Sequence, residues 1–159
     1  SNFDLVSAAG GTSIGGIGFD GSSILVGSNS NDSLLAFSDG ISSVVLDTAT
    51  IESLTDDIDG RVGFGDIFYA PDGRVYFYES DSDYIMSYDP ANPSESLSVV
   101  ISESELGEGP GSDIVGQLSW YQGNLSWTDQ SDGFFRIPEP STAGLLLISV
   151  PLLMRRRRA

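Results

Sequence analysis

The chain of 159 residues contains no cysteine, no histidine and no lysine. Without cysteine, no disulfide holds the fold, so stability has to come from a packed core. Without histidine, the commonest general base and the commonest metal ligand are both missing, and any bound metal would be held by oxygen atoms, which makes Ca²⁺ the default ion. The three absences also exclude a Ser-His-Asp triad, a cysteine nucleophile and a catalytic lysine.

Positive charge is scarce and unevenly distributed. The chain has 7 basic residues against 23 acidic ones, and four of the basic residues are the consecutive arginines of 155–158. Setting those four aside leaves only Arg61, Arg74 and Arg136, so the rest of the chain carries a net charge of −20. Such a body is not expected to bind nucleic acid, because that affinity depends on neutralising phosphates. The hydrophobic fraction of 40% favours a folded domain over a disordered one.

One pattern occurs three times along residues 1–137. Each copy has an apolar strand, a tight turn with glycine, a second strand rich in Val, Ile, Tyr or Trp, a polar loop and a third strand. The turn glycines are Gly21, Gly73 and Gly123, which are 52 and 50 residues apart. The copies lie near residues 14–50, 62–105 and 114–137.

The segments 41–46 and 97–101 follow the first two copies and are expected to be fourth, outer strands. Four antiparallel strands in about 50 residues is the plan of a β-propeller blade. The sequence therefore predicts an all-β body, a partial β-propeller with three visible blades. Only single helical turns are expected in it, near 50–54 and 102–106, and Gly15 and Gly16 are interpreted as a break between strands.

The second copy contains Ala-Pro-Asp-Gly-Arg-Val-Tyr at 70–76 and returns through Asp-Tyr-Ile-Met-Ser-Tyr-Asp at 83–89. These residues are similar to the NHL and SMP-30-like propeller repeats. A closed ring needs four to eight blades. The alternatives are further blades upstream or an open meander or β-sandwich. Upstream blades are favoured, since a blade needs neighbours to bury both of its faces. This agrees with the first residues, 1–6, which contain neither an initiator methionine nor a signal-peptide pattern.

The acidic segment 55–66 is a candidate metal site. Asp57, Asp59 and Asp66 fall at the third, fifth and twelfth positions of a calcium loop, which resembles the dockerin or EF-hand type. Thr55 stands where the first aspartate belongs, and Arg61 offsets part of the negative charge. A solvated loop between blades is the competing interpretation, and it is favoured.

Two other groups of residues are interpreted as structural. Glu79, Asp81 and Asp83 are expected to point outward from a loop rather than to hold a cation. Five aromatic residues are expected to belong to the core, with a stacking surface for sugar rings as the alternative. They are Tyr76, Tyr78, Trp120, Tyr121 and Trp127.

The last 22 residues, 138–159, form a distinct segment. Pro138, Glu139 and Pro140 precede an apolar run at 143–154 and the basic cluster of Arg155, Arg156, Arg157 and Arg158. This order resembles the PEP-CTERM sorting signal of Gram-negative bacteria. The resemblance implies a C-terminal hydrophobic helix, transient insertion in the inner membrane, anchoring by the arginines and cleavage by an exosortase-type membrane protease. The apolar run is shorter than the roughly 20 residues of a spanning helix, which favours transient insertion in the membrane over a permanent anchor.

Taken together, these features predict an exported cell-surface or biofilm-matrix protein of unknown molecular activity. We expect it not to be an enzyme, to need no cofactor apart from Ca²⁺ if the acidic loop binds it, and to contact exopolysaccharide or a protein partner. The alternative is a metal-dependent lactonase or hydrolase of propeller type.

Overall fold

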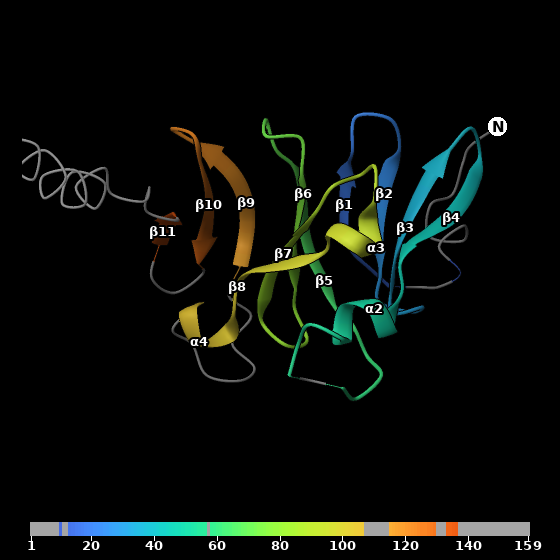
Figure 1. The fold of residues 1–159 in the computed structure, drawn as a ribbon, viewed down its shortest axis with the longest axis horizontal. Coiled ribbons are helices and arrows are strands. Elements are labelled where there is room, and N and C mark those ends of the chain that lie inside the picture. The colour runs from blue at the N-terminus through green and yellow to red at the C-terminus, as the bar shows by residue number, and fades with distance from the viewer. Residues whose placement is uncertain (1–9, 11–12, 57, 107–114, 130–132, 137–159) are drawn as a thin grey trace, which may run out of the picture.

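The computed structural model describes residues 10, 13–56, 58–106, 115–129 and 133–136. These residues form three antiparallel sheets that lie in a row, with the second sheet between the first and the third (Figure 1). The predicted all-β propeller repeats are thereby confirmed. Within the described ranges, no helix is long and apolar enough to cross a membrane. The predicted hydrophobic helix falls in 138–159, outside the described residues.

Each sheet follows chain order. Blade 1 consists of β1 (Ile14–Phe19), β2 (Ile24–Ser28), β3 (Ser33–Ser38) and β4 (Ile41–Leu46). Blade 2 consists of β5 (Phe64–Tyr69), β6 (Val75–Glu79), β7 (Tyr84–Tyr88) and β8 (Ser98–Ile101). Blade 3 consists of β9 (Val115–Tyr121), β10 (Asn124–Asp129) and β11 (Gly133–Arg136). The short helices are α2 (Thr48–Glu52), α3 (Pro93–Ser96) and α4 (Glu103–Leu106).

The three predicted turn glycines all have the backbone conformation that the prediction required. The φ angles of Gly21, Gly73 and Gly123 are +94°, +85° and +84°, a region that side chains with a Cβ disfavour. In blade 3 the residue before the glycine, Gln122, also has a positive φ, of +51°, as a two-residue type I′ hairpin needs. The turns lie at the end of the sheets opposite α2 and α4 (Figure 1).

The blades pack through two separate cores. Blade 1 contributes Leu25, Leu34 and Leu46 to a cluster with residues of blade 2 such as Phe77 and Met86. The other face of blade 2 packs against blade 3 in a second cluster. That cluster includes Tyr76, Tyr78, Ile85, Leu118, Leu125 and Trp127. Each sheet therefore buries its apolar side chains against its neighbour in the row, which is how repeat proteins gain stability.

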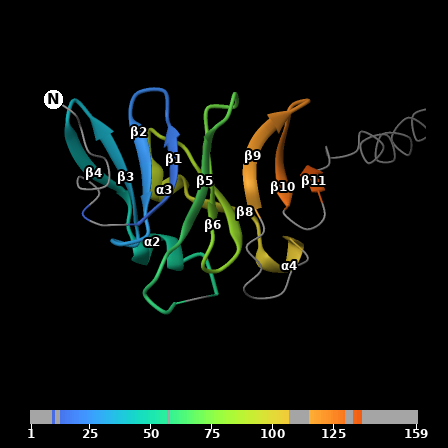
Figure 2. The same cartoon turned by 180° about the vertical axis from the view of Figure 1, so that it is seen from behind.

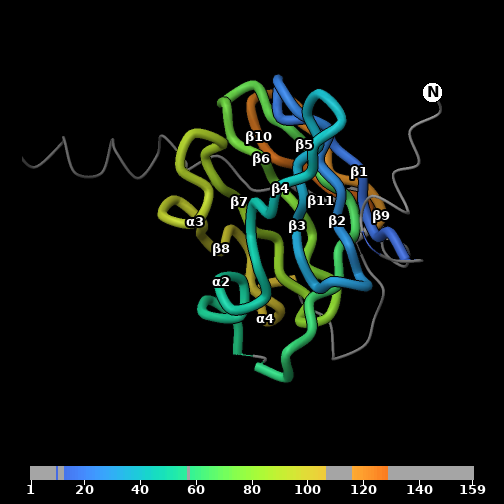
Figure 3. The backbone as a smooth tube through the Cα atoms, turned by 90° about the vertical axis from the view of Figure 1, so that its right-hand side faces the viewer, coloured from blue at the N-terminus to red at the C-terminus, as the bar shows by residue number. Residues whose placement is uncertain are grey.

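The first strands of the blades lie next to one another. Seen from behind, β5 lies between β1 and β9 (Figure 2). Along the row, β1 and β9 lie on one side of the molecule, and β4 and β8 lie toward the other side (Figure 3). This is the arrangement of propeller blades, whose first strands are closest to the axis.

Gly15 and Gly16 do not break the strands, as the sequence had suggested, but belong to β1. A Cβ atom on Gly15 would lie 1.7 Å from the carbonyl oxygen of Phe64, and one on Gly16 would lie 1.8 Å from that of Gly65. The backbones of β1 and β5 are therefore in direct contact. Glycine is needed here for close approach of two strands rather than for a turn.

Candidate functional site

The segment Arg61–Phe64, which leads into β5, is held by both of its neighbouring loops. The backbone N–H of Val62 donates to Asp32 Oδ1 at 3.3 Å, and that of Phe64 donates to Asn29 Oδ1 at 2.9 Å. Both acceptors lie in the β2–β3 loop of blade 1. The N–H of Gly63 points the other way and donates to Glu79 Oε1 of blade 2 at 3.0 Å. Alternate residues of an extended chain point to opposite sides, so this segment joins the two blades.

Glu79 is the buried acid of this region, with 1% of its surface exposed. Besides Gly63, it accepts hydrogen bonds from the backbone N–H groups of Asp81 at 3.0 Å and Ser82 at 2.8 Å. Burial raises the pKa of Glu79 above its ordinary value, and the hydrogen bonds it accepts oppose that shift. The carboxylate thus organises the β6–β7 loop and the chain that enters β5.

The expectation that the acidic cluster points outward is wrong for two of its members. Glu79 is buried for the reason just given, and Asp83 is buried where the Tyr78 hydroxyl donates to its carboxylate. The loop folds back over the end of β6, so its acids satisfy local donors. Acids in a polar loop are usually solvated, which is why the sequence pattern misled.

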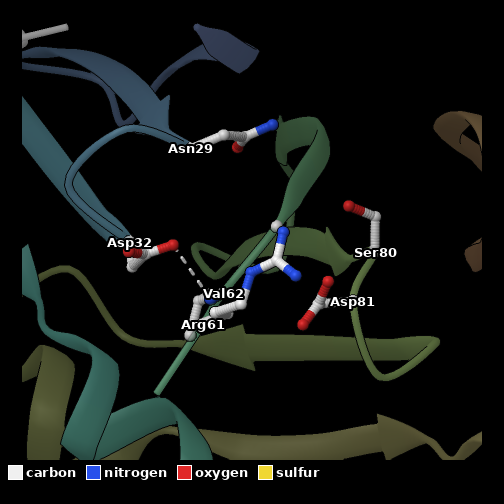
Figure 4. Close-up of a pocket in the computed structure, with 7 residues that line it drawn as sticks. Asn29, Asp32, Arg61, Val62, Ser80 and Asp81 are labelled. Carbon is white, nitrogen blue, oxygen red and sulfur yellow. Dashed lines mark hydrogen bonds between the residues drawn. The ribbon is translucent and has the colours of Figure 1, made fainter. Parts of the chain in front are cut away.

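A pocket of about 260 Å³ opens beside this segment, between blades 1 and 2. It is lined by Asn29, Asp32, Arg61, Val62, Gly63, Ser80 and Asp81. The Arg61 side chain reaches into the pocket, with Asp32 on one side and Asp81 on the other (Figure 4). Such a pocket can bind a polar ligand, because the guanidinium can stabilise negative charge on a ligand oxygen and a neighbouring carboxylate can accept a proton.

The sequence did not bring these pocket residues together. Asn29 and Asp32 come from the polar loop of the first copy, to which no site was assigned, and Arg61 was considered only for its effect on the charge of the candidate calcium loop. One signal could have singled out Arg61 as a candidate site residue. Basic residues are scarce in this chain, and Arg61 is one of only three arginines outside the C-terminal cluster.

The predicted calcium ligands lie in different surroundings, as far as they are described. Asp57 lies outside the described residues. Asp59 Oδ1 accepts the N–H of Arg61 at 2.9 Å, whereas Asp66 Oδ2 accepts the N–H of Leu118 in blade 3 at 2.7 Å. Burial raises the pKa of Asp66, and the hydrogen bond from the Leu118 N–H opposes that shift. The calcium loop stays a prediction.

The residues that the structure describes contain no group of three acidic, histidine or cysteine side chains that could hold a metal ion. In the pocket, Arg61 lies between the two aspartates, and its charge disfavours a cation there. We therefore assign no chemical step to a metal.

The core interpretation of the aromatic residues is confirmed for four of the five. Tyr76, Tyr78 and Trp127 are buried between blades 2 and 3, and Trp120 packs against them. Tyr121 is exposed, so the described residues contain no continuous aromatic platform from this set. The predicted sorting residues Pro138, Glu139 and Pro140, and the arginines at 155–158, lie outside the described part of the chain.

No protein-family model matches the chain, and no curated protein matches it in sequence. Two solved structures are similar to it in fold. One is a streptogramin B lyase, with a TM-score of 0.51, 12% sequence identity and coverage of 80% of this chain. The other is the virginiamycin B lyase of Staphylococcus aureus in its selenomethionine form, with a TM-score of 0.52, 15% identity and coverage of 81%. The chain spans only 41% and 42% of the length of these two proteins.

These similarities correct one expectation from the sequence. Both neighbours are enzymes by name, so the expectation that the chain is not an enzyme is contradicted. At this level of identity the likeness establishes the fold. The predicted sorting signal is not addressed by either structure.

Proposed function

We propose that this chain supplies three blades of a β-propeller enzyme of the hydrolase or lyase class, acting on an ester or lactone. The observation that carries the proposal is the pocket in which Arg61 lies between Asp32 and Asp81, at the end of the blades that carries α2. The propeller lyases are similar to this chain in fold, which supports an enzyme over a purely structural role. Their names identify their own substrates and not the substrate of this chain.

The chain has no histidine, so in this pocket a carboxylate takes the role of the base. Asp32 accepts the Val62 N–H and positions the segment. We propose Asp81, which lines the pocket on the other side of Arg61, as the base. In hydrolysis, a water oxygen bonds to the ester carbonyl carbon while Asp81 takes the water proton. The ester C–O bond then breaks, and that proton passes to the leaving oxygen. Arg61 stabilises the negative charge on the carbonyl oxygen.

Turnover of aryl esters and a panel of lactones by the full-length protein tests this proposal. We expect Arg61→Ala and Asp81→Asn each to lower kcat/KM by about 100-fold, the usual effect of losing one charge-stabilising group or one general base. Asp39→Asn is the matched control, because Asp39 lies in the exposed β3–β4 turn and asparagine tolerates its φ of +52°.

Product masses separate the two enzyme classes, since hydrolysis adds one water and elimination adds none. Turnover that survives both pocket substitutions would place the chemistry outside this pocket. Absence of turnover across the panel would contradict the enzyme proposal itself.

We also propose that the protein is exported, and that residues 138–159 are a PEP-CTERM signal. The support is the order of Pro138–Glu139–Pro140, an apolar run and four arginines. The route would use an exosortase-type protease and the inner membrane, and would deliver the protein to the cell surface or extracellular matrix. Exopolysaccharide is the partner that this location offers.

Replacing Pro138, Glu139 and Pro140 by alanine is expected to leave uncleaved precursor in the inner membrane, because the protease loses its extended recognition segment. Immunoblots of membrane and released fractions measure the ratio of the two forms. Glu95→Ala, a change in α3 at the surface of the body, serves as the control. Normal processing of the triple variant would refute the sorting proposal.

A further inference from the structure

Several aspartates in the chain are followed directly by glycine, a pair whose side chain and backbone can react with each other. They are Asp20, Asp39, Asp59, Asp72 and Asp132. The backbone nitrogen of the glycine can attack the side-chain carbonyl carbon of the aspartate, because glycine has no Cβ to hinder the approach. The product is isoaspartate, in which the main chain runs through the former side chain. Asp132 lies outside the described residues, so the other four pairs can be compared.

Hydrogen bonds decide which of these pairs can react in the folded protein. The carboxyl group has to rotate toward the next residue, and the glycine N–H has to leave any acceptor that holds it. A hydrogen-bonded pair reacts only after a local opening, whose free energy lowers the rate. Asp20 is held in this way, since its Oδ1 accepts the backbone N–H groups of Ser22 at 2.8 Å and Ser23 at 2.6 Å.

The Asp72–Gly73 pair is held at both reacting groups. One carboxylate oxygen of Asp72 accepts the N–H of Arg74 at 3.0 Å, and the other accepts the hydroxyl of Tyr76 at 2.7 Å. The N–H of Gly73 donates to the carbonyl oxygen of Ala70 at 3.0 Å. All three bonds oppose the approach of the glycine nitrogen to the carboxyl carbon.

The Asp59–Gly60 pair is exposed but is also held at both groups. Asp59 Oδ1 accepts the N–H of Arg61 at 2.9 Å. The N–H of Gly60 donates to Glu52 Oε1 in α2 at 2.6 Å. Exposure alone therefore does not make an aspartate–glycine pair reactive in this fold.

The Asp39–Gly40 pair is the exception. The two residues form the turn between β3 and β4, at the end of blade 1 opposite α2 (Figure 1). Both are exposed. Among the described residues, neither the Asp39 carboxylate nor the Gly40 N–H has a hydrogen-bond partner. A Cβ atom added at Gly40 would meet nothing within 4 Å, so a ring formed there has room.

We propose that Asp39–Gly40 is a site of spontaneous isoaspartate formation in the folded protein. The Gly40 nitrogen bonds to Asp39 Cγ, and the carboxyl OH leaves as water with the amide proton, which gives a five-membered succinimide. Water then adds to one of the two ring carbonyls. Opening at Cγ restores aspartate, and opening at the main-chain carbonyl carbon gives isoaspartate. The net reaction neither gains nor loses water and needs no oxidant.

The modification is expected to loosen one end of β4 and to leave the other end in place. Isoaspartate adds one carbon atom to the main chain, so the two-residue turn no longer holds Ser38 opposite Ile41. At the far end of the strand, Leu46 is buried, and the Thr48 hydroxyl donates to the carbonyl oxygen of Asp32 at 2.7 Å. The isomerised protein should therefore stay folded, with a frayed β3–β4 hairpin.

Peptide mapping of the full-length protein after incubation in mildly acidic buffer tests the proposal. Isoaspartate is identified by a changed retention time at unchanged mass and by resistance to a protease that cleaves before aspartate. The rate at each site in the folded protein is divided by the rate at the same site in denaturant, so that effects of local sequence cancel. We expect a ratio close to one for Asp39, and ratios lower by on the order of tenfold or more for Asp20, Asp59 and Asp72.

Asp39→Glu is the variant that checks the assignment, because glutamate would have to close a six-membered ring. The isoaspartate signal of the turn should vanish in this variant, while the rates at the other sites stay unchanged. A signal that persists would overturn the proposal, as would a ratio for Asp39 as low as those of the hydrogen-bonded pairs. The inference depends on the turn and not on the proposed activity, so either can fail without the other.

Discussion

Replacing Gly16 by alanine is expected to lower the free energy of unfolding by at least about 3 kcal/mol, the upper part of the usual range for overpacking. The added Cβ would lie 1.8 Å from the carbonyl oxygen of Gly65, which belongs to the backbone of β5 and cannot rotate away. The strands β1 and β5 would have to separate, and the core between blades 1 and 2 would open with them. Urea unfolding monitored by tryptophan and tyrosine fluorescence measures the loss.

Gly116→Ala is the matched control, since Gly116 lies on β9, the first strand of blade 3. Its added Cβ would meet only Thr128, with the side-chain oxygen at 3.0 Å, and that side chain can rotate. A cost below about 1 kcal/mol is expected for this variant. If both substitutions cost the same, the contact between the backbones of β1 and β5 would not be the reason for glycine in β1.

Removal of the Glu79 carboxylate should have the second largest effect. Glu79→Ala is expected to cost about 3 kcal/mol, because it leaves the part-buried N–H groups of Gly63, Asp81 and Ser82 without their acceptor. Glu79→Gln keeps one oxygen and should cost less. Glu95→Gln, at the surface, is the control for loss of one negative charge.

The same residue predicts a pH dependence. Burial raises the pKa of folded Glu79 above its ordinary value of 4.5. The folded protein therefore binds this proton more tightly than the unfolded chain, so the stabilisation is complete below pH 4.5 and is lost as the pH rises through the folded pKa. The free energy of unfolding of the natural protein should fall over this window. The fall should be smaller in Glu79→Gln, and an identical pH profile in both proteins would contradict the assignment.

The blades were predictable from the sequence because their turns depend on local chemistry. Gly21, Gly73 and Gly123 mark positive φ angles, and such angles leave a signature in one short stretch of chain. Strand alternation then assigned the aromatic residues near Tyr76 to a core before any partner was known. Helix α3 has a local start signal as well, Asn92 before Pro93 with Glu95 in the first turn, but it was not among the expected helical turns.

The candidate site was not predictable, because its parts meet only when two blades are assembled. Asp32 and Val62 are 30 residues apart and belong to different repeats. The role of Glu79 depends on N–H groups from its own loop and from the chain entering β5, which no periodicity records. The same limit applies to Gly15 and Gly16. Their contact with β5 cannot be seen in the sequence, so the glycine pair was interpreted as a break between strands.

The segment Arg61–Phe64 has a further consequence, because the pocket takes its walls from both blades that the segment joins. A ligand that fills the pocket binds only the assembled pair of blades. By mass action it therefore stabilises their association, by an amount that grows with the logarithm of its concentration above Kd. Because the chain has no cysteine, no disulfide can hold its repeats together, and a ligand in this pocket would then act as a reversible cross-link between them.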